Sequence, residues 1–131
     1  MVQAEGIEQT TLFRWAEFAE EQYPELRLMY HIPNEGKRSK VTGAQLKAQG
    51  LKAGVPDVCL PVAHGGYIGL YVEMKVQPNR PTENQKKWLR ALREAGHMVA
   101  VCYSWDEARK LIEDYLRLPN TILKGEMNET Q

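Results

Sequence analysis

Two acidic residues and one lysine, Asp57, Glu73 and Lys75, have types and a spacing that could support metal-dependent chemistry. Asp57 precedes one apolar run, and Glu73 and Lys75 follow the next. Successive side chains of a strand point to opposite faces, so Glu73 and Lys75 share a face and Met74 points to the other. If a hairpin register sets Asp57 opposite Glu73, two carboxylates and an ammonium group meet at one strand end. Such a set suits a divalent cation such as Mg²⁺ or Mn²⁺.

A purely structural interpretation of these residues is also open. Asp57 could cap a turn, and Glu73 and Lys75 could form an exposed ion pair, which contributes little stability. The six residues before Glu73 read Tyr-Ile-Gly-Leu-Tyr-Val and do not alternate between apolar and polar types. That run indicates a strand buried on both faces, where terminal charges are costly unless they are paired or bind an ion. The metal-binding interpretation is therefore favoured.

The elements that must position these residues follow from the hydrophobic pattern. Helices are expected at residues 6–22, 42–50, 83–95 and 104–116, and strands at residues 26–32, 58–62, 67–76 and 97–103. The turn Ala63-His64-Gly65-Gly66 would join the second and third strands into a hairpin. Helix 83–95 would make a right-handed crossover between the last two strands. This order predicts one α/β domain with a mixed sheet over residues 1–117 and a flexible tail over residues 118–131.

Charge is balanced overall but unevenly distributed along the chain. The 131 residues carry 17 Lys and Arg against 17 Asp and Glu, which gives a formal net charge of zero. Residues 36–56 hold five basic residues and no acid, and residues 75–93 hold six basic residues and one acid, whereas residues 1–26 hold six acids and one base. Such asymmetry can create a cationic face that binds a phosphate backbone. Ordinary solvated helix faces would explain some of the same charges.

Several other classes of protein are disfavoured. No apolar run is long enough to cross a bilayer, and two glutamates precede residue 9 where a signal peptide would be basic, so we expect a cytoplasmic protein without a membrane partner. Cys59 and Cys102 lie in apolar runs, where free cysteines behave as small hydrophobes, although a disulfide between them is possible. The three histidines do not have the spacing of zinc ligands.

With these elements placed, the arrangement resembles the PD-(D/E)xK nuclease superfamily and, within it, the virus-type replication-repair nuclease (VRR-NUC) domains. The resemblance rests on Pro56-Asp57, followed after fifteen residues by Glu73-Met74-Lys75. Gln85 on the next helix and Glu8 on the leading helix also match. The loop 31–36 and the turn Gly54-Val55-Pro56-Asp57 are also similar to that family. The resemblance covers about residues 5–117. It implies a restriction-endonuclease-like core, with a mixed central sheet flanked by helices, of the kind found in stand-alone phage-encoded members.

The resemblance also implies a metal site. Asp57 and Glu73 would bind one or two Mg²⁺ or Mn²⁺ ions together with the backbone carbonyl of Met74, and no organic cofactor is implied. Glu8 would complete the metal shell directly or through water. Its place in the first turn of a helix gives Glu8 a structural explanation as well, because the helix dipole favours an acid there.

The remaining roles concern the attacking water and the substrate. Lys75 would orient or deprotonate the water, and Gln85 would help to position the water or Lys75. A neighbouring carboxylate favours the charged ammonium, so an orienting role for Lys75 is favoured unless the metal screens Glu73. The candidate nucleic-acid-binding residues are Asn34, Lys37, Arg38, Lys47, Lys52 and Arg80.

These expectations predict a metal-dependent, structure-specific DNA endonuclease that cuts branched DNA such as Holliday junctions or flaps in replication, repair or recombination. Two alternatives remain: a non-catalytic nucleic-acid-binding or assembly module with the same fold, and a hydrolase of small phosphate esters. The hydrolase of small phosphate esters is less favoured, because the sequence has no Gly-rich phosphate loop. A homodimer is expected because a four-way junction has two-fold symmetry. Apolar helix faces and Trp15, Trp88 and Trp105 could supply its interface, although core packing explains tryptophans more often.

Overall fold

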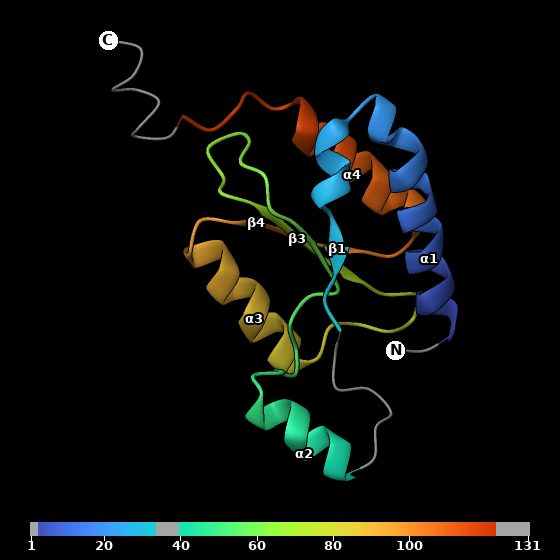
Figure 1. Ribbon diagram of the computed structural model, residues 1–131, viewed down its shortest axis with the longest axis vertical. Coiled ribbons are helices and arrows are strands. Elements are labelled where there is room, and N and C mark those ends of the chain that lie inside the picture. Colours follow the sequence, from blue (N-terminus) through green and yellow to red (C-terminus); the bar gives the residue numbers. More distant parts are fainter. Residues whose placement is uncertain (1–2, 34–39, 123–131) are drawn as a thin grey trace.

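A computed structural model describes residues 3–33 and 40–122 of the chain. Figure 1 shows a sheet with α3 on one side and α1 and α4 on the other. The elements in order are α1 (Gln3–Phe18), the 3₁₀ helices η1 (Ala19–Glu21) and η2 (Pro24–Leu28), β1 (Tyr30–His31), α2 (Lys40–Ala48), β2 (Val58–Leu60), β3 (Leu70–Met74), α3 (Glu83–Glu94), β4 (Met98–Cys102) and α4 (Trp105–Arg117). The predicted α/β class is therefore confirmed. Within the described residues, no helix is long and apolar enough to cross a membrane.

The sheet is mixed, with the strand order β1-β2-β3-β4. β2 pairs antiparallel with both β1 and β3, whereas β3 and β4 run parallel and are joined through α3. Thr82 caps α3 through a hydrogen bond from the Gln85 amide, and the Ser104 side chain caps α4. Ser and Thr before an amphipathic run favour a helix start, because their side chains accept from the first unpaired amides. This crossover unit fixes β4 beside the strand that carries Glu73.

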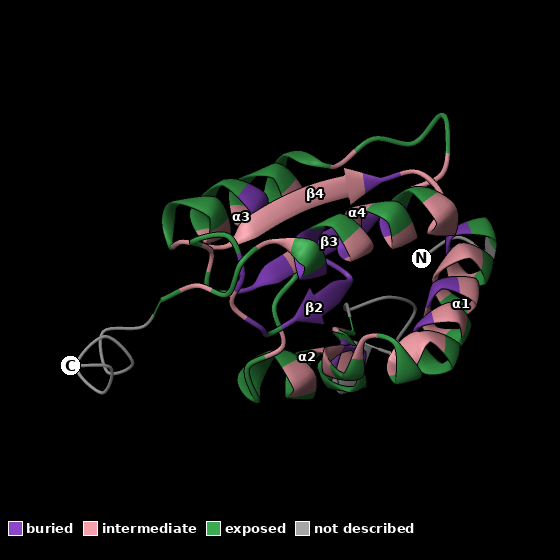
Figure 2. Ribbon diagram, turned by 90° about the horizontal axis from the view of Figure 1, so that it is seen from above, coloured by how far each residue is buried: buried purple, intermediate pink, exposed green. Residues whose placement is uncertain are grey.

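The core lies between the sheet and the helix pair α1 and α4. Alternate strand residues, Val58, Leu60, Leu70, Val72 and Met74, join one buried cluster with Leu12 and Ala16 of α1 and with Ala108, Ile112 and Tyr115 of α4. Figure 2 shows β2 and β3 buried and most of β4 only partly buried. The alternation leaves the intervening residues of β2 and β3, among them Cys59, Tyr71 and Glu73, on the opposite face of the sheet.

All four predicted strands are shorter than expected, and the third, predicted over residues 67–76, spans only Leu70–Met74. Only Tyr30–His31 of the segment 26–32 is a strand, and the 3₁₀ helix η2 precedes it. Pro24 stands at the first position of η2, where its fixed φ suits a helical turn and its missing N–H is not needed. The second strand ends at Leu60 because Pro61 has no N–H to donate to the ladder. The connection between β2 and β3 is therefore longer than the four-residue turn that we expected.

The predicted tail does not begin at residue 118. The Pro119 carbonyl accepts a hydrogen bond from the Gly65 amide at 2.7 Å, and the Thr121 hydroxyl donates to the Tyr67 carbonyl at 2.6 Å. Buried His64 has Nδ1 2.9 Å from the Leu118 carbonyl and Nε2 2.9 Å from Glu25 Oε1. These contacts bind residues 118–122 to the β2–β3 connection. The rest of the expected tail, residues 123–131, lies outside the described residues.

Candidate active site

Asp57 and Glu73 meet where the pairing of β2 and β3 ends. Val58 pairs with Val72, so the next position outward sets Asp57 opposite Glu73. The Met74 amide donates a 2.8 Å hydrogen bond to Asp57 Oδ2, which holds the Asp57 side chain against β3. Asp57 is 6% exposed and Glu73 is 2% exposed. The hairpin register thus brings two buried carboxyl groups together at one strand end.

Lys75 lies on the same face as Glu73. Its Nζ is 3.9 Å from Glu73 Oε2, and its side chain is nearly buried. The Lys75 amide donates to the Cys102 carbonyl at 2.9 Å, which continues the parallel pairing of β3 with β4 beyond Met74. Hydrogen bonds from the Met74 and Lys75 amides therefore fix the backbone that follows Glu73, and the Lys75 ammonium group lies beside the Glu73 carboxyl group.

The positive charge of Lys75 is not enough to offset the two buried carboxyl groups. Burial, together with the charge and side-chain hydrogen bonding of Asp57, raises the pKa of Glu73 to about 9, and the charge of Lys75 offsets this rise only in part. Glu73 Oε1 is buried and has no hydrogen-bond partner. A buried carboxylate with an unused oxygen is stable only if it is protonated or if a cation lies beside it.

The donor set fits a hard divalent ion better than zinc. Within residues 3–33 and 40–122, no three side chains of His, Cys, Asp or Glu are grouped so that they could hold a metal. Structural zinc needs four protein ligands and catalytic zinc three. Mg²⁺ keeps several waters and is commonly bound by only one or two carboxylates. Asp57 and Glu73, with the unused Glu73 Oε1, satisfy that smaller requirement.

Comparison with known proteins places the chain in a family. The family model of the VRR-NUC domain matches residues 4–106. The chain belongs to the VRR-NUC family. A solved structure described as a VRR_NUC domain protein superimposes with a TM-score of 0.76 at 26% identity, over 92% of this chain and 93% of that chain. No functionally curated protein matches the chain in sequence.

The VRR-NUC match confirms the predicted family and the nuclease-type domain, with DNA as the implied substrate. The fold of the solved VRR_NUC domain protein is also consistent with the predicted restriction-endonuclease-like core.

The structure does not bring two of the predicted site residues to the acid pair of this VRR-NUC domain. Glu8 Oε1 accepts a 2.9 Å hydrogen bond from the Trp105 amide, at the first residue of α4. Gln85 Oε1 accepts a 2.8 Å hydrogen bond from the Thr82 amide and completes a capping box with Thr82. Both side chains satisfy helix N-termini, whose first amides lack partners within the helix.

Glu5 is a buried acid that the sequence analysis did not select. It lies in the first turn of α1, is only 7% exposed, and its Oε2 is 3.3 Å from Asn79 Nδ2. Asn79 belongs to the segment that follows Lys75, so Glu5 contacts the chain just beyond the predicted site. Its spacing of three residues from Glu8 is the one signal in the sequence, because residues three apart share a helix face.

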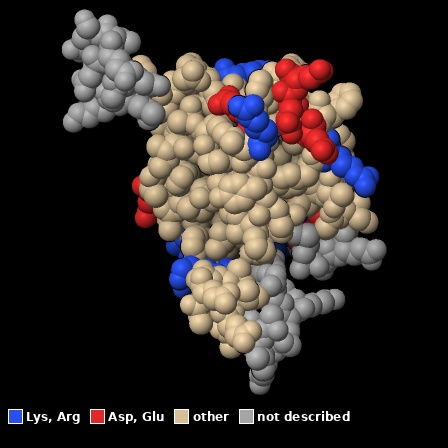
Figure 3. All heavy atoms as spheres, viewed as in Figure 1, with Lys and Arg blue, Asp and Glu red and all other residues tan. Residues whose placement is uncertain are grey.

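The predicted DNA-binding residues are described only in part. Asn34, Lys37 and Arg38 lie outside the described residues. Lys47 in α2, Lys52 after it and Arg80 before α3 are exposed, and α3 adds the exposed residues Lys86, Lys87, Arg90 and Arg93. Basic side chains therefore accumulate on α2, α3 and the segments beside them. Figure 3 shows acidic side chains near the end of the molecule formed by η1, η2 and α4, with basic side chains directly beside them.

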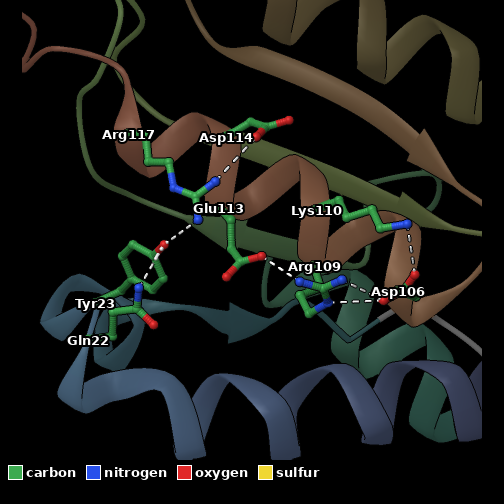
Figure 4. Close-up of polar contacts among 8 residues, drawn as sticks. All are labelled: Gln22, Tyr23, Asp106, Arg109, Lys110, Glu113, Asp114 and Arg117. Carbon is green, nitrogen blue, oxygen red and sulfur yellow. Dashed lines mark hydrogen bonds and ion pairs between the residues drawn. The ribbon is translucent and has the colours of Figure 1, made fainter.

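The basic residues of α4 are neutralised by their neighbours. Arg109 Nη2 is 2.8 Å from Asp106 and its Nη1 is 2.6 Å from Glu113, and Lys110 Nζ is 3.2 Å from Asp106 (Figure 4). Arg117 lies 3.8 Å from Asp114 and also donates to the Tyr23 hydroxyl. The α4 surface thus carries paired charges. On α3, Lys86 also pairs with Glu83 at 3.3 Å, but basic residues outnumber acids over α2, α3 and the segments beside them.

The raised pKa of Glu73 predicts a pH dependence of stability in the metal-free protein. The folded state keeps a proton on Glu73 up to about pH 9, whereas the unfolded state releases it near the ordinary value of 4.5. The free energy of unfolding should therefore fall as pH rises from about 5 to 9, by roughly 1.4 kcal/mol per unit of pH over which the proton difference persists. Glu73→Gln should remove this fall.

The measurement is urea denaturation with a chelator present at pH 5, 7 and 9. Glu83→Gln is the matched control, because Glu83 is a strongly exposed carboxylate on α3. If the free energy of unfolding changes with pH in the same way for the wild type and Glu73→Gln, the raised pKa of Glu73 is contradicted.

Proposed function

We propose that this VRR-NUC protein is a Mg²⁺- or Mn²⁺-dependent endodeoxyribonuclease that hydrolyses phosphodiester bonds in branched DNA, such as flaps or Holliday junctions. The observation that carries the proposal is the buried pair Asp57 and Glu73, with an unused Glu73 oxygen and with Lys75 beside it. Two buried like charges destabilise a fold unless a cation offsets them. Their retention is explained if the cation and the phosphate of the substrate meet there.

The side chains of the site divide the work. Asp57 and Glu73, with the Met74 carbonyl, would hold the ion. A bound divalent ion lowers the pKa of its water and offsets the charge that develops on the phosphate. Lys75 Nζ, aimed at Glu73, can donate hydrogen bonds to the attacking water or to a nonbridging phosphate oxygen. Burial and the backbone contacts of Met74 and Lys75 hold these groups in fixed positions, as electrostatic catalysis requires.

The cationic α2 and α3 side supplies a surface for the phosphate backbone. Lys47, Lys52 and Arg80 are exposed there, and the basic residues of α3 extend the same region. Contacts of this kind position DNA without reading its sequence, which suits an enzyme that recognises branch structure. Asn34, Lys37 and Arg38 remain proposed members of this surface.

Homodimerisation is part of the proposal. A C₂ dimer would present two active sites to the two symmetry-related strands of a junction. Trp15 and Trp105 are poor interface candidates, because both pack against the main core. The outer face of α1 is better, since Phe18 is 88% exposed and Ile7, eleven residues earlier on the same helix face, is 57% exposed.

Loss of an acid or of the lysine should abolish cleavage. Asp57→Asn keeps an oxygen for the Met74 amide but removes the charge, and Lys75→Ala removes the ammonium donor. Each should lower Mg²⁺-dependent cleavage of a labelled flap and a four-way junction by about 100-fold or more. Cleavage is measured with Mg²⁺, Mn²⁺ and chelator in parallel.

Gln85→Ala and Thr82→Ala form a matched control pair, because they remove the two halves of one capping box. They should lower stability alike, by about 1 kcal/mol, and change cleavage alike. Unimpaired cleavage by Asp57→Asn would refute the site. Binding of DNA by the wild type without cleavage under any metal would favour the non-catalytic module instead.

The α1 face predicts the oligomeric state. Phe18→Asp places a charge in the proposed interface, so the molar mass in solution should change from that of a dimer to that of a monomer. Light scattering coupled to size exclusion at several concentrations measures it, and Ile122→Asp, at another exposed apolar residue, is the control. A monomeric wild type, or a Phe18→Asp variant that still dimerises, would rule out this interface.

A further inference from the structure

A row of uncharged side chains crosses the sheet directly beside the acid pair. The strand registers align Tyr30 with Cys59, Cys59 with Tyr71, and Tyr71 with Val99. Cys59 lies two residues after Asp57 on one strand, and Tyr71 lies two residues before Glu73 on the next. Side chains two residues apart share a face and stand roughly 7 Å apart. The row and the acid pair are therefore neighbours on the same face.

The two tyrosines of this row are both accessible and held in place. Tyr30 is 50% exposed, Tyr71 is half-buried, and Cys59 is buried between them. Hydrogen bonding to the Cys59 thiol raises the pKa of Tyr30, and burial with the same thiol contact raises the pKa of Tyr71 to about 12. Tyr71 also packs edge-on against His97, with ring centroids 4.9 Å apart at 88°. The register therefore sets Tyr30 and Tyr71 on either side of the buried Cys59 in one row.

The neighbouring rows differ in the chemistry that they can bind. The Tyr30–Tyr71 row has aromatic rings and no charged side chain, whereas the next row has two carboxyl groups with Lys75 beside them. With the divalent cation of the proposed function bound at the acid pair, a ligand that spans both rows has a phosphate at one end and a flat uncharged group at the other. A nucleotide has this composition. In a paired duplex both faces of each base are covered by its neighbours, so only an unpaired base can offer a face to an aromatic ring.

We propose that Tyr30 and Tyr71 form a stacking site for an unpaired base of the DNA strand whose phosphate lies at Asp57 and Glu73. The inference rests on the proposed nuclease function for the position of that phosphate, and it specifies the substrate as DNA with a single-stranded segment at the point of cleavage. Flaps and single-strand-to-duplex transitions satisfy this requirement. A four-way junction satisfies it when a base at the crossover unpairs.

The stacking site predicts a loss of DNA affinity that appears only when the Tyr30 ring is removed and only for DNA with unpaired bases. Tyr30→Ala should weaken binding of a flap by about tenfold or more, because base–aromatic stacking is lost, and should leave a paired duplex of the same sequence unaffected. Tyr30→Phe, which keeps the ring, should bind as the wild type does. Ile122→Ala is the control for loss of an exposed apolar side chain. Binding is measured by fluorescence anisotropy with a chelator present, which prevents metal-dependent cleavage.

A second readout locates the base. A 2-aminopurine placed at successive positions across the flap junction should be quenched by the wild type and by Tyr30→Phe at one or two adjacent positions, but not by Tyr30→Ala. If Tyr30→Ala unfolds, as thermal denaturation would show, Tyr30→Leu keeps apolar area without a ring and gives the same test. Equal effects of Tyr30→Ala on flap and duplex, or no effect on either, would overturn the stacking site.

Failure of this inference and failure of the nuclease proposal give different results. Tyr30-dependent flap binding by a wild type that cleaves nothing would leave the stacking site standing and reject the nuclease. Efficient cleavage of paired and flapped DNA alike, with Tyr30→Ala as active as the wild type, would keep the nuclease and reject the stacking site.

Discussion

The antiparallel register of β2 and β3 is the constraint on which the rest of the structure depends. Side chains alternate along a strand, so a slip of one residue would send Asp57 into the core and a valine to the site. The pairs Val58–Val72 and Leu60–Leu70 prevent that slip, because both are buried against α1 and α4. The hydrogen bond from the Met74 amide to Asp57 then fixes the acid itself. The same strand pairing therefore sets both the packing of the core and the geometry of the candidate site.

The same register creates an electrostatic problem that gives the site its chemistry. Glu73 is almost fully buried, has one oxygen without a partner and lies beside a second acid, while Lys75 offsets only part of the charge. A core of apolar residues on the opposite face supplies the stability that such an arrangement requires. The deficit of positive charge is local to this strand end.

The sequence predicted that Asp57, Glu73 and Lys75 lie together because the signals that place them are local. Apolar runs and the two-residue period of a strand place Asp57, Glu73 and Lys75, and the same patterns placed α3, β4 and α4 closely. Predictions failed where a side chain had a competing partner. The capping box of Thr82 and Gln85 could have been read from their spacing, but the Trp105 amide that holds Glu8 is distant in sequence. The contacts of residues 118–122 with the β2–β3 connection are also long-range and carry no periodic signal.

The most direct measurement is titration of Mn²⁺ into the metal-free protein by calorimetry, with no DNA present. If the acid pair is a metal site, the wild type binds Mn²⁺ and the Glu73→Gln and Asp57→Asn variants lose at least about tenfold in affinity, while Glu83→Gln binds as the wild type does. The uptake should release protons, because Glu73 is protonated in the metal-free state at neutral pH. Mn²⁺ affinity that is the same in all four proteins, or no binding by the wild type, would contradict a metal centre at this strand end.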